Sequence, residues 1–366
     1  MLPSMVKYKR GDFMLNKIEK LREQFDSLEI DACLITSASN HYYFAEFDNC
    51  DGALFVTRDG AYAFEDFRYI EIAQKTIGDT YSIFETSLDL EKINSIIVAE
   101  KIKAIGFEDT RLSYFLHQRI ASKITADLKP IGRVIEKMRE VKSPRELEKI
   151  AIAQEITDGA FAHLLKMITP TMTENDVSAE LEYYMRKHGA QDKSFETIAV
   201  SGEKSSMPHG VPSDTRLKKG FLTMDFGALY DGYHSDMTRT ICIGRADDEM
   251  KRLYNTVLNA QKSVLDMLRD GIAGSEADKV ARDIIEKDYP NCFGHSLGHG
   301  VGLEIHEAPN LSGRNQSPLV PGNVVTVEPG IYISGKYGCR IEDLVIIKEG
   351  EIRNLTKSPK ELIEIY

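Results

Sequence analysis

Residues 221–244 read FLTMDFGALYDGYHSDMTRTICIG and decide the fold of the longer part of the chain. Asp231 and Gly232 separate two apolar-rich segments, and an Asp-Gly pair in that position is a strong signal for a two-residue hairpin loop. With these two residues as the loop, Gly227 lies directly opposite Asp236. The segment therefore predicts an antiparallel hairpin that leaves space beside an acidic side chain.

Asp225 lies on the same face of this hairpin, one diagonal step from Asp236, with the Cβ atoms about 7–8 Å apart or somewhat less. Two carboxylates converging over a glycine suit a metal site, whereas on an exposed face both would simply be solvated. Asp225 stands between Met224 and Phe226, in a strand with the pattern of a buried one. There an isolated carboxylate costs several kcal/mol unless it is paired or metal-bound. The hairpin alone leaves both interpretations open.

Three of the nine histidines gather in residues 293–309, which read FGHSLGHGVGLEIHEAP. The glycines between His295, His299 and His306 make a helix improbable and favour a tight strand and loop, where backbone can approach a ligand closely. A lone histidine is usually structural, but three in one glycine-rich loop are more often functional. Neutral imidazole is a common ligand of transition metals.

Two glutamates stand at breaks in apolar strands. Glu328 ends a strand in VVTVEPGIYI, residues 324–333, where Pro-Gly forces a turn, and Glu342 lies between apolar runs in CRIEDLVII, residues 339–347. One buried glutamate could be explained as an ion pair with Arg340. Two in the same region as the histidine loop favour a shared role.

Charge counting favours combining these segments into one site. Four carboxylates and a neutral imidazole supply four negative charges, which match two divalent cations. Ligation mostly by oxygen, without thiolate, suits manganese, cobalt(II), iron(II) or zinc. Two metal ions about 3.5–4 Å apart are a familiar hydrolytic arrangement. The predicted ligands are Asp225, Asp236, His299, Glu328 and Glu342.

Composition excludes several classes of protein. The net charge of −11 provides no basic patch for a nucleic-acid partner. The sequence contains no run of 18 apolar residues, so we expect no membrane span. The five scattered cysteines lack CxxC spacing, which argues against a disulfide framework and fits the cytoplasm. We expect no signal peptide, and we expect residues 1–13 to be a disordered arm or a misplaced start.

The chain divides into two predicted domains. Residues 14–135 alternate short strands with helical segments, which predicts an α/β domain. Residues 143–366 begin with a capping box at Ser143, and then show the order helix, capped helix, strands twice. The second helix of each round would be capped by Thr173 and Ser275, about a hundred residues apart. This predicts an α+β domain with an internal pseudo-two-fold repeat and a cleft between its halves.

Four segments, DFGALYDGYHSDMTRT, SLGHGVGLEIHE, VEPGIY and RIED, resemble in order and spacing the pita-bread metallopeptidases. That family contains methionine aminopeptidase, Xaa-Pro aminopeptidase and Xaa-Pro dipeptidase (prolidase). The resemblance covers residues 143–366. A weaker match of residues 14–135, including DFRY, resembles the creatinase-like N-terminal domain of the proline-specific branch.

The resemblance implies a role for each predicted ligand. Asp225 would bind one metal ion, and Asp236 would bridge both ions. His299 and Glu328 would bind the second ion, and Glu342 would form the other bridge. Manganese is the expected metal, with cobalt, zinc or iron as alternatives.

The resemblance also implies catalytic and substrate-binding residues. His209 would steady the tetrahedral intermediate, His306 would contact the substrate carbonyl, and Glu328 would relay the proton to the departing proline nitrogen. His295 would lie near the same cleft, and Arg340 matches the arginine beside the last ligand; both are expected to bind substrate.

The predicted activity is hydrolysis of the bond between an N-terminal residue and proline, as in an Xaa-Pro aminopeptidase. The alternative is an Xaa-Pro dipeptidase restricted to dipeptides, and a third is a non-catalytic peptide-binding module. Methionine aminopeptidase lacks a comparable N-terminal domain, and a creatinase-type enzyme would dispense with the metal ligands. A homodimer is expected by resemblance, and His41, Asp66 and Arg68 are candidates for closing the cleft beyond the proline.

Overall fold

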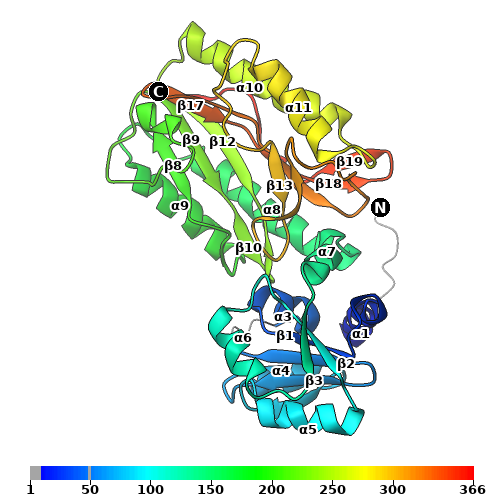
Figure 1. Cartoon of the computed structure of the whole chain (residues 1–366). Helices are drawn as coiled ribbons and strands as arrows, with labels where there is room; N and C mark the ends of the chain where they lie inside the picture. The colour runs from blue at the N-terminus through cyan, green and yellow to red at the C-terminus, as the bar shows by residue number, and fades with distance from the viewer. Residues whose placement is uncertain (1–9, 48–50) are drawn as a thin grey trace. The chain divides into compact units, whose positions relative to one another are not determined.

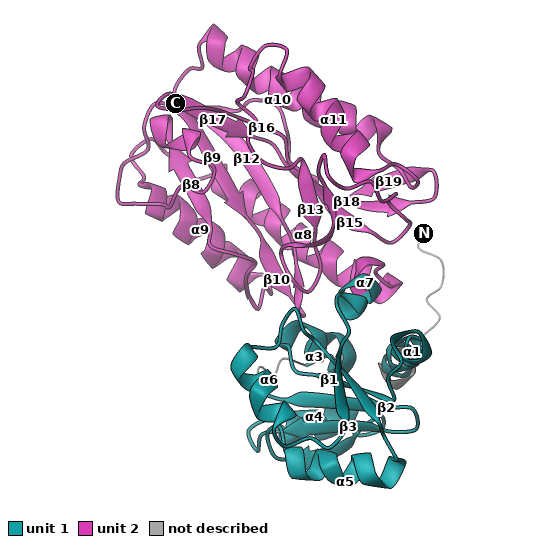
Figure 2. Cartoon of the chain, viewed as in Figure 1, with its two compact units in different colours: residues 1–138 teal, residues 139–366 magenta. Residues whose placement is uncertain are grey.

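The structure is a computed structural model that describes residues 10–47 and 51–366. The chain forms two compact units, Met1–Met138 and Arg139–Tyr366 (Figure 2). Each unit encloses buried apolar clusters of its own. Among the described residues, no helix combines the length and the apolar character that crossing a bilayer requires.

The first unit is built on a six-stranded mixed sheet with the order β4-β3-β2-β1-β5-β6. Figure 1 labels its strands β1, β2 and β3. The pairs β1–β2 and β2–β3 are antiparallel, whereas β1–β5, β3–β4 and β5–β6 are parallel. The strands are β1 (Ala32–Ile35), β2 (Ala53–Thr57), β3 (Ala61–Glu65), β4 (Ser82–Glu85), β5 (Ala104–Phe107) and β6 (Asp127–Pro130). The helices are α1 (Arg10–Arg22), α2 (Phe25–Leu28), α3 (Ala38–Ala45), α4 (Ile70–Ile77), α5 (Leu90–Glu100), α6 (Tyr114–Ala121) and α7 (Val134–Glu140), which runs past the end of this unit.

Two features of the first unit differ from the sequence-based expectation. Helix α1 begins at Arg10, so the predicted arm is wrong for residues 10–13, and for residues 1–9 it lies outside the described residues. Helix α3 was not predicted. Its Tyr42, Tyr43 and Phe44 are buried, and this tertiary packing outweighs the modest helix propensity of aromatic residues.

The second unit packs helices on both sides of a set of β-sheets (Figure 1). Helices α8 and α9 share one apolar cluster with β8, β9 and β12, and α10 and α11 share another with β15, β17 and β18. The helices are α8 (Pro144–Leu164), α9 (Glu174–Lys187), η1 (Gly202–Ser206, a 3-10 helix), α10 (Asp248–Met267) and α11 (Gly274–Ile285). The strands are β7 (Asp192–Lys193), β8 (Ile198–Ser201), β9 (Gly220–Phe226), β10 (Ala228–Tyr230), β11 (Tyr233–His234), β12 (Met237–Ile243), β13 (Gly298–Gly300), β14 (Glu307–Leu311), β15 (Val324–Val327), β16 (Gly330–Ile333), β17 (Tyr337–Arg340), β18 (Asp343–Lys348), β19 (Glu351–Asn354) and β20 (Glu364–Ile365).

The hairpin at the centre of this unit has the predicted register. Tyr230 pairs with Tyr233 at the loop, and Phe226 pairs with Met237 further along, so Gly227 lies opposite Asp236. A Cβ atom at Gly227 would stand 2.0 Å from the carbonyl oxygen of Ser235. Only glycine therefore allows the two strands to approach so closely at the point where the acidic side chain projects.

The two halves of the unit repeat one arrangement. Thr173 precedes α9 and forms an isolated β-bridge with Arg216, and Ala273 precedes α11 and forms one with Pro318. The two caps stand one hundred residues apart. The same helix start, pinned to a later segment in the same way, occurs in both halves.

The predicted cap of α11 is wrong by two residues. The helix starts at Gly274, so Ser275 lies inside its first turn. Glu276 reaches back to accept a hydrogen bond from the N–H of Ala273 at 3.0 Å. Since a carboxylate three residues beyond the cap satisfies this N–H group, the helix can start at a residue without a hydroxyl.

Candidate metal centre

A cavity of about 1070 Å³ lies in the second unit. All of the predicted site residues line it, although they come from segments spread over more than 130 positions. They are His209, Asp225, Asp236, His295, His299, His306, Glu328, Arg340 and Glu342.

The acidic side chains and one imidazole meet at the base of this cavity. Asp236, His299 and Glu342 each offer a ligand atom, and these atoms lie within 4.8 Å of one another. The Nε2 atom of His299 is 3.5 Å from Asp236 Oδ2 and 3.3 Å from Glu328 Oε1. Asp236 lies just before β12, Glu328 just after β15 and Glu342 just before β18. These breaks between strands allow the three side chains to turn inward beside His299 of β13.

The orientation of His299 is fixed by hydrogen bonds. Its Nδ1–H donates to the carbonyl of Gly300 at 3.1 Å, and a carbonyl can only accept, so the lone pair of Nε2 faces the carboxylates. The backbone N–H of His299 donates to Thr326 Oγ1 at 3.0 Å, and that hydroxyl donates to Glu328 Oε1 at 3.2 Å. Thr326 therefore ties two predicted ligands together, as outer partners of metal ligands do.

Buried carboxylate oxygens without donors provide a test of the fit to metal ions. Asp225 Oδ2 accepts from Arg340 at 2.7 Å and Glu342 Oε2 accepts from Thr238 at 2.7 Å. Within the described residues, Asp225 Oδ1, Asp236 Oδ1 and Glu342 Oε1 are buried and accept no hydrogen bond. A buried acceptor without a partner is costly. Divalent cations would satisfy these oxygens, so the residues present fit the metal ions that the charge count requires.

The pKa shifts in the site also follow from the burial of several carboxylates close together. Burial, followed by repulsion from neighbouring carboxylates, raises the pKa of Asp236 and of Glu342 well above the usual range. Burial raises the pKa of Glu328 to about 8. Burial, assisted by His306, lowers the pKa of His299 to about 4. These shifts indicate that the side chains around the site supply too little positive charge to balance its buried carboxylates.

A hydrogen-bonded chain runs from Arg340 to the histidine loop. Arg340 Nη1 donates to the Tyr332 hydroxyl at 2.6 Å, which lies 3.1 Å from His295 Nε2. The Nδ1–H of His295 donates to the Ser296 carbonyl at 2.9 Å, so the tyrosine donates to Nε2. Tyr332 was not predicted. The register of β16 with β17, in which Gly330 faces Arg340, makes it a diagonal neighbour of the arginine.

Arg340 is 3% exposed and its guanidinium binds protein groups, so substrate contact by this residue stays a prediction. Its Nε donates to Thr238 at 3.0 Å, beside the bonds to Tyr332 and Asp225. It holds one oxygen of Asp225 and leaves the other oxygen free to face the cavity.

The remaining histidines occupy the cavity walls. The ring of His306 lies 4.3 Å from that of His299, centroid to centroid. His209 is exposed on the loop that follows η1. The predicted roles of His209 in steadying the tetrahedral intermediate and of His306 in contacting the substrate carbonyl stay predictions.

The three candidates for closing the cleft all have local partners in the first unit. His41 is fully buried, with Nε2 2.9 Å from Glu65. Arg68 forms exposed ion pairs with Asp66 at 2.6 Å and Asp51 at 2.8 Å. The burial of His41 argues against a contact with substrate.

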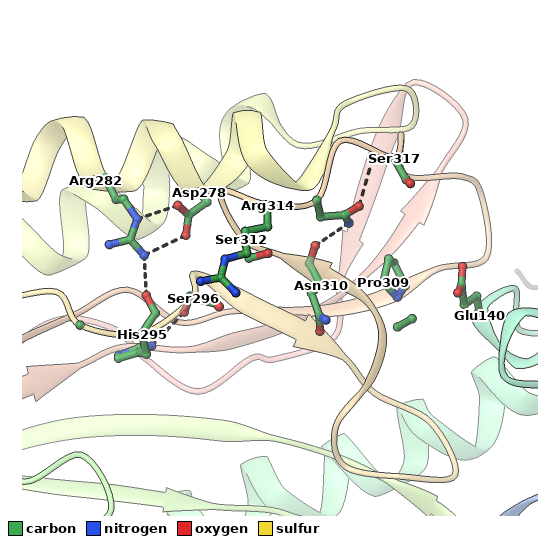
Figure 3. Close-up of a pocket in the computed structure, with 14 residues that line it drawn as sticks. Glu140, Asp278, Arg282, His295, Ser296, Pro309, Asn310, Ser312, Arg314 and Ser317 are labelled. Carbon is green, nitrogen blue, oxygen red and sulfur yellow. Dashed lines mark hydrogen bonds and ion pairs between the residues drawn. The ribbon is translucent and has the colours of Figure 1, made fainter. Parts of the chain in front are cut away.

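A second cavity of about 900 Å³ adjoins the first and shares Gly294, His295, Ser296 and Asn310 with it. Figure 3 shows Arg282 bonded to Asp278 and to the carbonyl of His295. The ion pair of Arg282 with Asp278 therefore fixes the backbone at His295, which lines both cavities.

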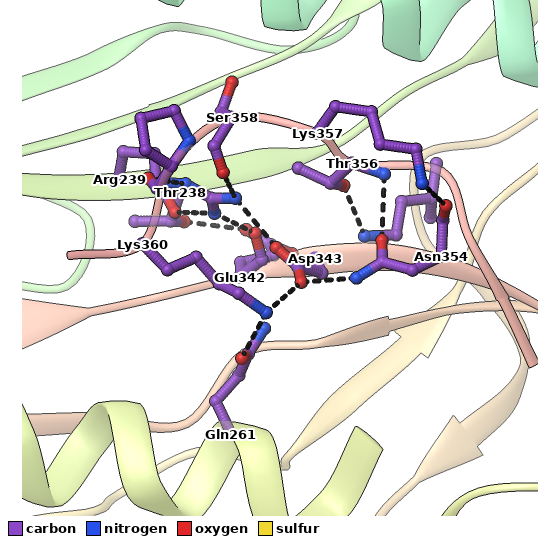
Figure 4. Close-up of polar contacts among 12 residues, drawn as sticks. Thr238, Arg239, Gln261, Glu342, Asp343, Asn354, Thr356, Lys357, Ser358 and Lys360 are labelled. Atoms are coloured by element: carbon purple, nitrogen blue, oxygen red, sulfur yellow. Dashed lines mark hydrogen bonds and ion pairs between the residues drawn. The ribbon is translucent and has the colours of Figure 1, made fainter. Parts of the chain in front are cut away.

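A buried network of polar side chains contacts the backbone of Glu342 and its neighbour Asp343 (Figure 4). Arg239 donates to the carbonyl of Glu342 and, at 2.8 Å, to Asp343 Oδ1. Lys360 donates to Asp343 Oδ2 at 2.6 Å. The backbone at this predicted ligand and directly after it is therefore held in place.

Two family models match the chain. Residues 148–349 match metallopeptidase family M24, and residues 17–141 match the creatinase/prolidase N-terminal domain. The second unit carries the former match and the first unit most of the latter.

Relatives and solved structures agree with these matches. The chain is 37% identical to an Xaa-Pro dipeptidase of Pyrococcus horikoshii, over 96% of this chain and 100% of the relative. It resembles the solved Xaa-Pro dipeptidase from Bacillus anthracis (TM-score 0.93, 42% identity, 96% and 100% of the two chains). It also resembles an X-Pro aminopeptidase from Thermotoga maritima (TM-score 0.87, 38% identity, 94% and 100%). The predicted resemblance and fold class are confirmed: the chain belongs to metallopeptidase family M24, with a creatinase/prolidase N-terminal domain ahead of the pita-bread catalytic domain, and is a peptidase.

Proposed function

We propose that this chain is an Xaa-Pro dipeptidase that holds two divalent metal ions. The observation that carries the proposal is the convergence of four carboxylates and one imidazole on one cavity, with three buried carboxylate oxygens that accept no hydrogen bond within the described residues. The proposed ligands are Asp225, Asp236, His299, Glu328 and Glu342. Manganese is the proposed metal, because mostly oxygen ligation with one imidazole suits it.

The names of the relatives support the dipeptidase over the aminopeptidase that the sequence-based interpretation preferred. Both the Pyrococcus horikoshii relative and the Bacillus anthracis structure are named Xaa-Pro dipeptidase. The aminopeptidase remains a second candidate, supported by the Thermotoga maritima structure and by the adjoining second cavity, which offers room for a longer peptide.

The reaction joins water to the scissile carbonyl carbon and breaks the bond from that carbon to the proline nitrogen. Bound divalent ions supply a water of lowered pKa and polarise the carbonyl. In the proposal Glu328 takes the proton of the attacking water and delivers it to the proline nitrogen. His209 and His306 donate hydrogen bonds to the carbonyl oxygen. The free α-amino group of the substrate meets the acidic cavity, which accounts for attack at the N-terminal bond.

We further propose domain limits at 14–135 and 143–366, a cytoplasmic location and a homodimer. Within the described residues all cysteines are free thiols, which supports a reducing compartment; Cys50 lies outside them. The dimer rests on the family resemblance alone.

We expect Ala-Pro to be hydrolysed with a kcat/KM about tenfold or more above that of Ala-Pro-Ala, a difference of about 1.4 kcal/mol in transition-state binding. The measurement is initial rates after loading with Mn²⁺ or Co²⁺, and Ala-Ala is the control for the proline requirement. Equal or faster cleavage of the tripeptide would favour the aminopeptidase. Hydrolysis of neither proline peptide by the metal-loaded protein would favour a binding module.

A further inference from the structure

The loop Met207–Pro212 forms one wall of the metal-centre cavity. All six of its residues line the cavity, and Met207 and Val211 are 58% and 75% exposed. Its backbone hydrogen bonds are local, from the N–H of Met207 to the carbonyl of Lys204 and from the N–H of Gly210 to that of Met207. The position of the loop, and of His209 within it, therefore depends on what holds its two ends.

The carboxylate of Glu174 holds both ends. This residue is the first of α9 and is fully buried. Its Oε2 accepts from Lys204 Nζ at 2.6 Å and from the Ser213 hydroxyl at 2.8 Å, and its Oε1 accepts from the Ser201 N–H at 2.9 Å. Lys204 lies in η1 just before the loop and Ser213 directly follows it.

These bonds are strong because the carboxylate is charged. Burial alone would raise the pKa of Glu174, but the bonds from Lys204, Ser201 and Ser213 outweigh it and lower that pKa below its usual value. Hydrogen bonds in which the donor or the acceptor is ionised are about twice as strong as neutral ones. The start of a helix also favours a negative charge.

Capping of α9 does not explain Glu174. Thr173 and Asp176 form that cap with each other: the Thr173 hydroxyl accepts from the Asp176 N–H at 3.0 Å, and the Asp176 carboxylate accepts from the Thr173 N–H at 2.7 Å. In the other half of the pseudo-repeat, Gly274 occupies the equivalent position at the start of α11. A carboxylate there is thus not required by the shared architecture. It occurs in the half that carries the His209 loop.

We propose that Glu174 is a positioning residue that fixes the loop Met207–Pro212, and with it His209, against the metal centre. The inference rests on the proposed function, since it assigns the loop to the wall of the substrate site. Glu174 acts through Lys204 and Ser213, and this role requires no contact between Glu174 and the substrate.

The test compares Glu174→Gln, which keeps the size and removes the charge, with Asp176→Asn, which weakens the cap of the same helix. Hydrogen–deuterium exchange of the loop is measured on the metal-loaded protein, together with melting temperature, metal content and kinetics on Ala-Pro. We expect Glu174→Gln to speed exchange in the loop about tenfold and to lower kcat about tenfold, with metal content unchanged. Asp176→Asn is expected to lower the melting temperature without either effect, and Lys204→Arg to retain slow exchange.

Loop exchange at the wild-type rate in Glu174→Gln, or equal acceleration in Asp176→Asn, would overturn the proposal. Exchange is measured without substrate, so it decides the role of Glu174 even if the wild-type protein fails to hydrolyse proline peptides. That failure would contradict the proposed function separately.

Discussion

Replacing Asp236 by asparagine is expected to lower kcat/KM for Ala-Pro by about 10³-fold or more, because loss of even an outer partner of a metal ligand costs about 10–100-fold. Asp236 lies near His299 and Glu342, and its Oδ1 is buried and accepts no hydrogen bond from any residue that the structure describes. Asp236 would bridge the two ions, so the charge of its carboxylate would stabilise both ions. An amide has the same size but supplies neither that charge nor a second carboxylate oxygen, so bound metal should fall to one ion per chain or less.

Metal content after dialysis, measured by mass spectrometry, and steady-state kinetics check this prediction together. The matched control is Asp283→Asn in the same unit, since Asp283 is exposed and pairs with Lys279 one helical turn away. The control should keep the metal and the rate. A variant at Asp236 that retained two ions and wild-type activity would rule out the bridging role.

Replacing Arg239 by methionine is expected to lower the free energy of unfolding by about 3–5 kcal/mol, the usual cost of removing one partner from a buried ion pair. Arg239 is 1% exposed, and its guanidinium donates to Asp343 and to the carbonyls of Glu342 and Ser358 (Figure 4). Methionine fills much of the space, but the buried carboxylate of Asp343 would then keep only Lys360 as a charged partner among the described residues. The backbone of Glu342 would also lose its support.

Urea unfolding of the metal-free protein measures this effect without the contribution of bound ions. Lys279→Met is the matched control, because the side chains of Lys279 and Asp283 are 70% and 63% exposed. Such an exposed pair contributes about 0–1 kcal/mol. Equal losses in the two variants would show that the Arg239 network adds no more than a surface ion pair. Should Arg239→Met fail to fold, Lys360→Met removes a partly exposed member of the same network and is expected to cost less.

The central hairpin was predictable because its signal is local. Asp231-Gly232 fixes the loop, the loop fixes the register, and the register places Gly227 opposite Asp236. The meeting of this hairpin with the histidine loop and with Glu328 and Glu342 is different. Spacing along the chain does not determine such contacts, and the expectation that they meet came from charge counting and from the family resemblance.

Side chains that support the site escaped prediction for the same reason. Thr238 follows Asp236 by two positions, but its bond to Glu342 spans 104 positions of sequence. Glu174 reads as part of a capping motif, and its bonds to Lys204 and Ser213 span 30 and 39 positions. A local motif accounts for the helix start but not for the loop that its second residue holds.

Helix starts were predictable where the cap is local. Ser143 and Thr173 both stand at their predicted positions, each with a carboxylate three residues later. The start of α11 was misplaced because Ala273 pairs with Pro318 across the fold, and no hydroxyl marks the position. In α3, burial of aromatic side chains decides the structure, and burial cannot be read from a segment of eight residues.

The most direct test of the metal centre is a crystal structure of the protein grown with Mn²⁺, with anomalous scattering recorded at the manganese edge. We expect two anomalous peaks about 3.5–4 Å apart. Both would lie among the carboxylates of Asp225, Asp236, Glu328 and Glu342, with His299 bound to one of them. Peaks elsewhere, or no peak among these side chains in crystals that contain manganese, would contradict the assignment.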